Sequence, residues 1–253
     1  MSIMATERLA IGTAIDGTDA PGAVPVAQAL GVPQALGVTQ ALGEVRRRQL
    51  GYAFTKRLID VLVSALLLVL LLPIFVAVAV AIRLDSPGSV LYRADRVGRF
   101  GKTFSVLKFR SMRAGCSSGP HVEFVRSLLR DGNTCDMYKV EADRRVTRLG
   151  AMLRRTSLDE LPQLWNVLRG DMSLVGPRPD VAYAVDEYAD WMHRRLDVKP
   201  GMTGLWQVSG RSRLGLLDMY RLDVTYAEQA SFVLDVKLLL RTIPVVLGRD
   251  GAA

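Results

Sequence analysis

Two adjacent carboxylates, Asp159 and Glu160, lie among arginines in the stretch SLDELPQLWNVLRGDMSLVGPRP. Arginines precede the pair, and Arg178 follows it between two prolines. The simpler interpretation is a helix cap, in which Ser157 and Glu160 form a capping box and Asp159 favours the positive end of the helix. The second interpretation is a site for phosphate and a metal ion.

The neighbouring residues favour the phosphate site. Pro162 would disturb a helix that begins at Ser157, and the prolines beside Arg178 restrict its backbone, as suits a guanidinium that holds phosphate with a planar fork. A carboxylate can attack phosphorus to form an acyl phosphate, and it can hold Mg²⁺ together with phosphate oxygens. Phosphoryl transfer also needs basic groups that balance charge. The basic candidates are Lys108, Arg110, Arg154 and Arg178.

The composition favours a membrane surface as a partner. The 253 residues are 49% hydrophobic with a mean hydropathy of +0.19, and the net charge is +8. A basic chain attracts nucleic acid, anionic lipid or phosphorylated substrates. Because this chain is also apolar and has no zipper, zinc-finger spacing or RNP-like strand, we expect no nucleic-acid partner. Cys116 and Cys135 form no CxxC pair and are typical of free thiols in a reducing compartment.

The apolar segment 59–82 contains Asp60 near its start and only Ser64 and Pro73 as later interruptions. A straight helix of about 22 residues would reach roughly 33 Å and cross a bilayer. Pro73, however, kinks or breaks a helix, and basic flanks on both sides favour the cytoplasm for both ends. A re-entrant helix satisfies both observations, while a single span is the simpler alternative. The flanking basic residues are Arg46, Arg47, Arg48, Lys56 and Arg57 before the segment and Arg83, Arg93, Arg96, Arg99 and Lys102 after it.

Three regions are expected along the chain. Residues 1–45 are rich in Ala and Gly, and their QALG echo fits neither a helical nor a strand period, so we predict a disordered tail. Residues 46–88 hold the basic flank and the membrane helix. Residues 89–253 are expected to form an interfacial catalytic domain that is mainly α with a few short strands, of the α+β class.

Within that domain the patterns predict individual elements. Residues 89–112 alternate around two glycines and predict short strands with a turn, whereas 114–140 are Gly/Ser-rich and then weakly helical. From Arg145 onward the pattern is helical, and 181–196 places apolar side chains on one helical face. Residues 232–243 carry another apolar stripe, which fits either the core or a lipid surface, and core is the expectation.

Five motifs in order then resemble one known family. They are KRLIDVLVS with the broken apolar helix, LKFRSM, RVTRLGAMLRRTSLDELPQLWNVLRGDMSLVGPRP, VKPGMTGLWQVSGR and LDVKLLLRTI. Together they cover about residues 50–250, and the chain resembles the bacterial sugar transferases, also called monotopic phosphoglycosyl transferases. The resemblance implies transfer of a sugar 1-phosphate from a UDP-sugar to polyprenyl (undecaprenyl) phosphate, which primes exopolysaccharide or other glycan assembly.

The resemblance also implies roles for particular residues. Asp159 matches the catalytic aspartate, a nucleophile that forms an aspartyl-phosphosugar and contributes to Mg²⁺ binding, and Glu160 matches its acidic partner. Pro73 matches the proline that breaks the re-entrant helix, although many members have serine where this chain has Leu72. The basic positions that match those near the phosphates are Lys108, Arg154 and Arg178.

The stretch VKPGMTGLWQVSGR has two interpretations. Its glycines alone indicate a turn-rich connector. The resemblance to the family implies instead that this stretch lines the nucleotide-sugar pocket, with Gln207 and Arg211 as polar candidates. The implied location is the bacterial inner membrane, with inner-membrane lipids as partners and the catalytic domain on the cytoplasmic face. The alternative is a non-catalytic, membrane-anchored adaptor that holds acidic partners on its basic surface.

Overall fold

The computed structural model describes residues 35–113, 126, 129, 145–210 and 214–248. The chain divides into two units, Met1–Arg48 and Gln49–Ala253, and the second unit contains the elements that position the carboxylate pair. Most of the predicted tail and most of the segment 114–140 lie outside the described residues. Where the tail is described it differs from the prediction, because helix α2 begins at Ala35. Ala, Leu and Gln are good helix formers, so the helix of the following segment can extend back over them.

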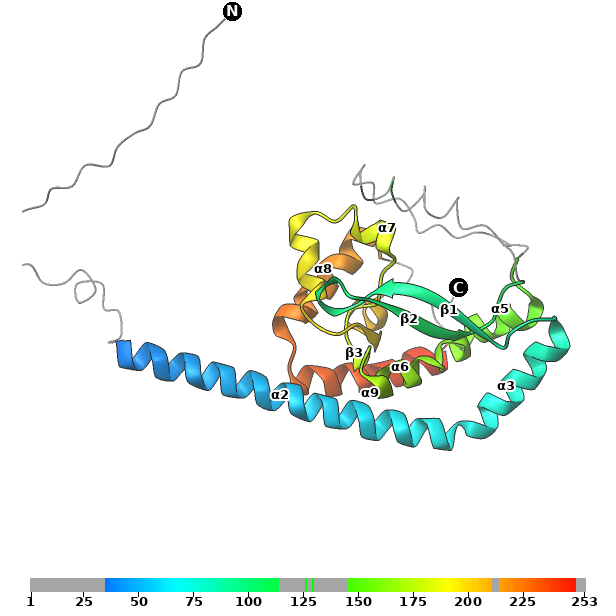
Figure 1. Ribbon diagram of the computed structural model, residues 1–253, viewed down its shortest axis with the longest axis horizontal. Helices are drawn as coiled ribbons and strands as arrows, with labels where there is room; N and C mark the ends of the chain where they lie inside the picture. Colours follow the sequence, from blue (N-terminus) through cyan, green and yellow to red (C-terminus); the bar gives the residue numbers. More distant parts are fainter. Residues whose placement is uncertain (1–34, 114–125, 127–128, 130–144, 211–213, 249–253) are drawn as a thin grey trace, which may run out of the picture. The chain divides into compact units, whose positions relative to one another are not determined.

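The described part of the chain is mainly helical with a few short strands, as predicted (Figure 1). The α-helices are α2 (Ala35–Leu70), α3 (Leu72–Asp85), α5 (Arg148–Arg155), α6 (Gln163–Arg169), α7 (Ala182–Val185), α8 (Leu216–Gln229) and α9 (Phe232–Gly248). The 3₁₀ turns are η1 (Arg99–Gly101), η2 (Leu158–Glu160), η3 (Asp190–Leu196) and η4 (Trp206–Val208). The strands are β1 (Leu91–Val97), β2 (Thr103–Phe109), β3 (Ser173–Val175) and β4 (Gly201–Thr203).

The strands form two small sheets. β1 and β2 are antiparallel, with Tyr92 opposite Lys108, so the hairpin predicted within 89–112 is confirmed. β3 and β4 are parallel neighbours, and the sequence analysis missed both. Each is only three residues long, which is too short for an alternating pattern to show.

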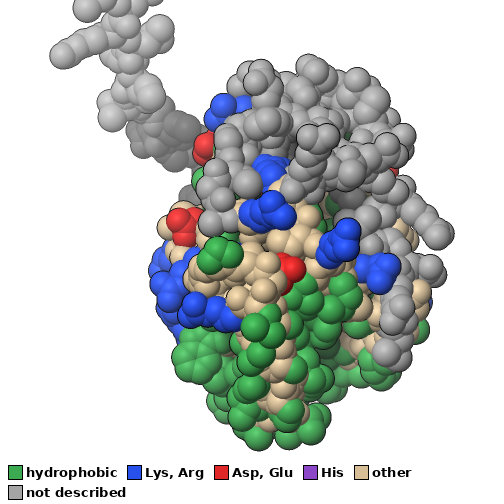
Figure 2. Space-filling model, turned by 90° about the vertical axis from the view of Figure 1, so that its right-hand side faces the viewer, with side chains coloured by type: hydrophobic (Ala, Val, Ile, Leu, Met, Phe, Trp, Pro, Cys, Tyr) green, Lys and Arg blue, Asp and Glu red, His purple; other side chains and the backbone are tan. Residues whose placement is uncertain are grey.

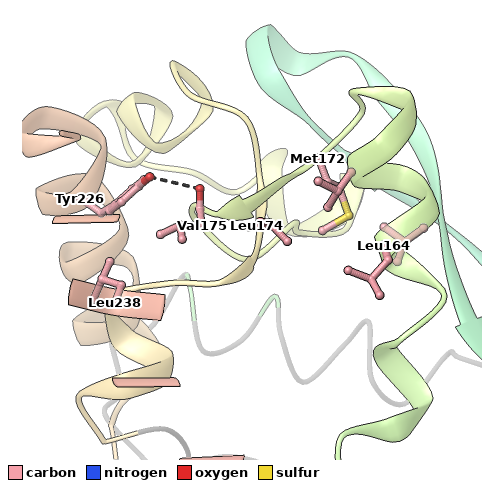
Figure 3. Close-up of a cluster of buried hydrophobic side chains, with 8 residues drawn as sticks. Leu164, Met172, Leu174, Val175, Tyr226 and Leu238 are labelled. Atoms are coloured by element: carbon pink, nitrogen blue, oxygen red, sulfur yellow. Dashed lines mark hydrogen bonds between the residues drawn. The ribbon is translucent and has the colours of Figure 1, made fainter. Parts of the chain in front are cut away.

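The main core lies around β3. Tyr226 of α8 and Leu238 of α9 approach this strand from one side, and Leu164 of α6 approaches from the other (Figure 3). All three side chains are buried, as is Val175 of β3. The Tyr226 hydroxyl lies 3.1 Å from the Val175 carbonyl, so this strand is fixed by a polar contact as well as by apolar packing.

The long apolar segment is bent. Among the described residues no single helix is long and apolar enough to cross a membrane. Leu50–Leu70 and Leu72–Asp85 pass that test together, but the pair is bent by 60° at the break between them. Pro73 lies in the first turn of α3, where its missing N–H has no helical partner to lose. The bend therefore forms at the proline, with Leu72 rather than serine before it.

The start of the bent pair is anchored to the globular core. Lys56 of α2 donates to the Asp235 carboxylate of α9 at 2.7 Å and to the Val175 carbonyl at 3.0 Å. Tyr52 donates to the same carboxylate at 2.9 Å. One turn further along, the buried Asp60 carboxylate accepts hydrogen bonds from β3. In Figure 1, α2 and α9 accordingly lie side by side.

The end of the bent pair is anchored to the same unit. The Arg110 guanidinium, just beyond β2, donates to the Ser86 carbonyl at 2.6 Å and to its hydroxyl at 3.0 Å. Ile82 of α3 is buried against Phe109 and Leu153. Both ends of the bent pair thus contact one globular body, although they are far apart along the helices.

Two predicted helical faces differ from the structure. The segment 181–196 is split into α7 and η3, because Tyr188 and Arg195 both turn toward Asp180 and bend the chain between the two elements. The stripe in α9 is not core: Val233 is 75% exposed and Leu240 is 63% exposed. Asp235 faces inward to meet Lys56, and this pairing turns the apolar stripe outward.

Replacing Lys56 by methionine should destabilise the fold by about 3 kcal/mol, the low end of the cost of breaking a buried ion pair from one side. Two tyrosines still donate to Asp235, so a larger loss is not expected. The double variant Lys56→Met/Asp235→Leu removes both charges and should recover most of the loss. Thermal unfolding of the purified chain in detergent measures both. Equal instability of the single and double variants would contradict this account.

Candidate active site

The carboxylate pair lies in a tight connection between α5 and α6. Thr147 caps α5 by accepting from the Gly150 N–H at 2.9 Å, and Gly150 packs so closely on the Ser111 backbone that a Cβ would clash there. After α5 the chain reverses at Ser157, whose φ is 56°. The Ser157 side chain makes no capping hydrogen bond, so the capping-box interpretation is wrong. Pro162 instead precedes α6.

Glu160 holds two cations from different parts of the chain. Its Oε1 lies 2.7 Å from the Lys108 ammonium of β2 and 2.7 Å from the Arg178 guanidinium, which also reaches Oε2 at 3.3 Å. Burial raises the pKa of Glu160, but the charges of Arg178 and Lys108 outweigh it and hold the pKa well below its ordinary value. Glu160 is therefore an ionised clamp.

The neighbouring Asp159 carboxylate has a different environment from that of Glu160. Its side chain is 7% exposed, and its carboxylate accepts no hydrogen bond from the described part of the chain. Burial raises the pKa of Asp159, while the neighbouring charge of Lys108 opposes the rise. A poorly solvated carboxylate without hydrogen bonds, close to cations, is suited to act as a nucleophile or as a metal ligand.

Side chains outside the pair position the two cations. The fully buried Asn166 of α6 accepts from the Leu107 N–H at 2.9 Å and donates to the Ser105 carbonyl at 2.8 Å. This amide fixes β2 immediately before Lys108. The loop after β3 is fixed by Gly176, which packs so closely on β4 that a Cβ would meet the Gly201 nitrogen.

Arg195 supports the loop that carries Arg178. It is 4% exposed and donates to the Arg178 carbonyl at 2.8 Å, to Asp180 at 3.0 Å and to Asp223 at 2.5 Å. Sequence reasoning missed Arg195, Asp180 and Asn166. Asp180 could have been found from the sequence, because it directly follows the GPRP motif. Arg195 and Asn166 could not, because a single arginine or asparagine within a helical pattern does not indicate a supporting role.

The remaining predicted site residues have different positions. Arg154 donates to the Ser111 hydroxyl at 2.9 Å, and its charge reaches Asp159. Arg110 was predicted to bind phosphate, but its guanidinium is buried at the end of α3 and bonds to Ser86. Gln207 donates to the Met202 carbonyl within the β4–η4 connection. Arg211 lies outside the described residues.

The donor set fits Mg²⁺ only with help from a substrate. The described residues contain no cluster of three or more His, Cys, Asp or Glu that could hold a metal ion. Both oxygens of Glu160 already accept from cations, which leaves the Asp159 carboxylate as the available ligand of the pair. Mg²⁺ commonly binds through one or two carboxylates plus substrate phosphates and water. Asp159 therefore fits Mg²⁺ as a shared ligand with a diphosphate.

Residues 51–249 match the bacterial sugar transferase family. The chain belongs to this family. The match contains the bent helix pair, the hairpin, the carboxylate pair and α9, so it includes every element that positions the site.

Curated members of the family carry more specific names. The UDP-galactose-lipid carrier transferase of Erwinia amylovora is 42% identical over 79% of this chain and 42% of its own length. The UDP-glucose:undecaprenyl-phosphate glucose-1-phosphate transferase of Caulobacter vibrioides is 40% identical over 78% of this chain and 71% of its own length. Exopolysaccharide production protein ExoY of Sinorhizobium fredii is 38% identical over 78% of this chain and 88% of its own length. This chain thus spans less than half of the Erwinia protein.

Ser157→Val should lower the free energy of unfolding by about 1–2 kcal/mol, because a β-branched side chain tolerates the left-handed backbone poorly. Ser157→Gly should change it by less than about 0.5 kcal/mol, since relief of strain offsets the greater freedom of the unfolded chain. Ser209, at φ −107°, provides a control at which valine meets no such strain. Denaturant unfolding compares the three, and a fully stable Ser157→Val protein would show that the reversal at Ser157 is not required.

Proposed function

We propose that this chain transfers a sugar 1-phosphate from a UDP-sugar to undecaprenyl phosphate and so primes exopolysaccharide assembly. The observation that carries the proposal is the pair itself: a buried carboxylate that accepts no hydrogen bond from the described residues stands next to one that binds two cations. Membership of the sugar transferase family and the names of its relatives support the substrate classes. The ExoY relative supports exopolysaccharide as the product pathway.

The first half-reaction uses Asp159 as the nucleophile. A carboxylate oxygen attacks the sugar-bearing phosphorus of the UDP-sugar, the bond from this phosphorus to the bridging oxygen breaks, and UMP leaves with the electron pair. Lys108 and Arg178 lie where they can neutralise charge on the phosphoryl oxygens, which is the main source of catalysis in phosphoryl transfer. Glu160 keeps these two cations together while Asp159 reacts.

The second half-reaction regenerates the carboxylate. A phosphate oxygen of undecaprenyl phosphate attacks the phosphorus of the aspartyl-phosphosugar, and the acyl–phosphate bond breaks with its electron pair returning to Asp159. Both donor and acceptor phosphates are anionic, so the same cations serve both steps. Mg²⁺, held by Asp159 together with the donor diphosphate, would supply further charge neutralisation when bound.

The acceptor lies in lipid, and we propose that the bent pair α2–α3 enters the inner membrane from the cytoplasmic face and returns to it. The two anchors of this pair on one globular body support a re-entrant path, because a spanning helix would separate its ends by the membrane. Figure 2 shows hydrophobic side chains gathered at the lower part of one face, with basic side chains above them. Exposed apolar residues on α2, α3 and α9 include Leu62, Leu66, Val69, Ile74, Val80, Val233 and Leu240.

Asp159→Asn should leave the fold intact and abolish UMP release. The amide has nearly the volume of the carboxylate but neither attacks phosphorus nor binds Mg²⁺ well. The measurement is UMP release from UDP-glucose, UDP-galactose and N-acetylated UDP-hexoses, with undecaprenyl phosphate present and absent. Asp190→Asn, at an exposed carboxylate, is the matched control and should retain wild-type rates.

The same experiment separates the enzyme from a membrane-anchored adaptor. An adaptor releases no UMP from any donor, whichever acid is present at residue 159. Without acceptor, the enzyme should release at most about one UMP per chain and gain the mass of a sugar phosphate, which the Asp159→Asn protein should not. Undiminished turnover in a folded Asp159→Asn protein would overturn the assignment of the nucleophile.

The re-entrant path predicts that both ends of the chain stay inside the cell. Single cysteines at positions 5 and 253, in a Cys116→Ser/Cys135→Ser background, should resist a membrane-impermeant thiol reagent until cells are opened. Labelling of one end alone in intact cells would establish a true crossing. Pro73→Ala restores a straight helix of roughly 33 Å and should expose the N-terminal site in a fraction of molecules. The basic flank before the segment should resist complete inversion.

A further inference from the structure

Arg96 of β1 is a half-buried arginine that the reaction described above does not use. Its neighbour Val97 donates to the Asp180 carbonyl at 2.8 Å, in an isolated antiparallel bridge. This bridge ties the end of β1 to the loop that carries Arg178, two residues before Asp180. The Arg96 side chain is therefore held close to the Arg178 side of the active site.

Arg96 has no carboxylate partner within ion-pair distance among the described residues. The hydrogen bond recorded for its guanidinium goes to the Asp95 carbonyl of its own strand, at 2.9 Å. Asp180 is the nearby acid, but its carboxylate already accepts from Arg195, two tyrosine hydroxyls and the Val181 N–H. Asp180 therefore compensates the charge of Arg96 only at a distance, with no ion pair or hydrogen bond between the two side chains.

The charge of Arg178 acts on both Arg96 and Lys108. Burial lowers the pKa of both groups and the charge of Arg178 adds to the effect, while Glu160 opposes it at Lys108 and Asp180 opposes it at Arg96. Lys108 is opposite Tyr92 in the hairpin, and Arg96 follows four residues later, about 13 Å along the strand at 3.3 Å per residue. The cations therefore form a row that begins at Asp159 and leads away from it.

The row carries more positive charge than the pair can balance. Among the described residues, four basic side chains, Lys108, Arg154, Arg178 and Arg96, interact with the acids Asp159, Glu160 and Asp180. The row therefore keeps a net positive charge, which attracts the diphosphate of a nucleoside diphosphate sugar. Like charges held this close are favourable only when an anion joins them, and guanidinium groups bind phosphate with two parallel hydrogen bonds.

Given the proposed transfer, we propose that Arg96 binds the nucleoside-bearing phosphate of the donor. In the first half-reaction this phosphate takes the electron pair of the broken bond and leaves as part of UMP, so Arg96 stabilises the leaving group. Lys108 and Arg178 act on the phosphate that stays, and Arg96 acts on the phosphate that departs. The row of cations is thus divided between the two products of bond cleavage.

Direct binding of UMP to the intact chain in detergent tests this division. Arg96→Gln should weaken UMP about ten-fold or more, as expected for loss of one charge-assisted contact, while Arg96→Lys recovers part of the affinity. Binding of uridine, which has no phosphate, should not change. Arg93→Gln is the matched control, because Arg93 is exposed on the opposite face of the same strand. Wild-type UMP affinity in Arg96→Gln, or equal losses in both variants, would overturn the proposal.

Kinetics give a second, independent outcome. Arg96→Gln should raise the KM for the UDP-sugar and weaken product inhibition by UMP, with the KM for undecaprenyl phosphate unchanged. Its thermal midpoint should stay near that of the wild type, since the side-chain hydrogen bond of Arg96 within the described residues goes to its own strand. The Asp159→Asn chain should still bind UMP. Failure of turnover together with Arg96-dependent UMP binding would sink the proposed transfer and leave the phosphate subsite standing.

Discussion

The Glu160 carboxylate is the contact on which the site depends. It joins three segments that come from different parts of the chain: β2 through Lys108, η2 through its own backbone, and the loop after β3 through Arg178. Without this negative charge, Lys108 and Arg178 would repel each other across a half-buried space. Glu160 accepts the hydrogen bonds of both cations, whereas the Asp159 carboxylate accepts none from the described residues, which suits the nucleophilic role proposed for it.

A second carboxylate has a comparable role beside the apolar helices. Asp235 gathers Lys56, Tyr52 and Tyr226, and so holds α2 against α8 and α9. This pairing decides which face of α9 points outward and exposes its apolar stripe next to that of α2. Asp235 and Glu160 thus have the same structural role: each is a largely buried carboxylate that accepts hydrogen bonds from donors in distant segments of the chain.

Sequence patterns predicted the mainly helical class, the hairpin and the residues of the clamp, since each has a local signal. The acid pair, GPRP and the alternation around two glycines are all visible within a few residues. The role of Arg110, the inward Asp235 and the supporting Arg195 depend on contacts with residues more than twenty positions away. The division of 181–196 into two elements also depends on tertiary contacts, because hydrogen bonds to Asp180 outweigh the helical pattern of the apolar residues.

Lys108 and Arg110 also fix the distance between the carboxylate pair and the end of α3. Lys108 binds Glu160, and two residues later Arg110 donates to Ser86, just after α3. Two residues of extended chain cover about 7 Å, with no flexible linker between them. The distance of Asp159 from the apolar helices is therefore set by this short extended segment at the end of β2. On the proposed re-entrant path, a bilayer of different thickness would have to adjust to the protein, because Asp159, the proposed nucleophile, has no flexible joint here that would let it move.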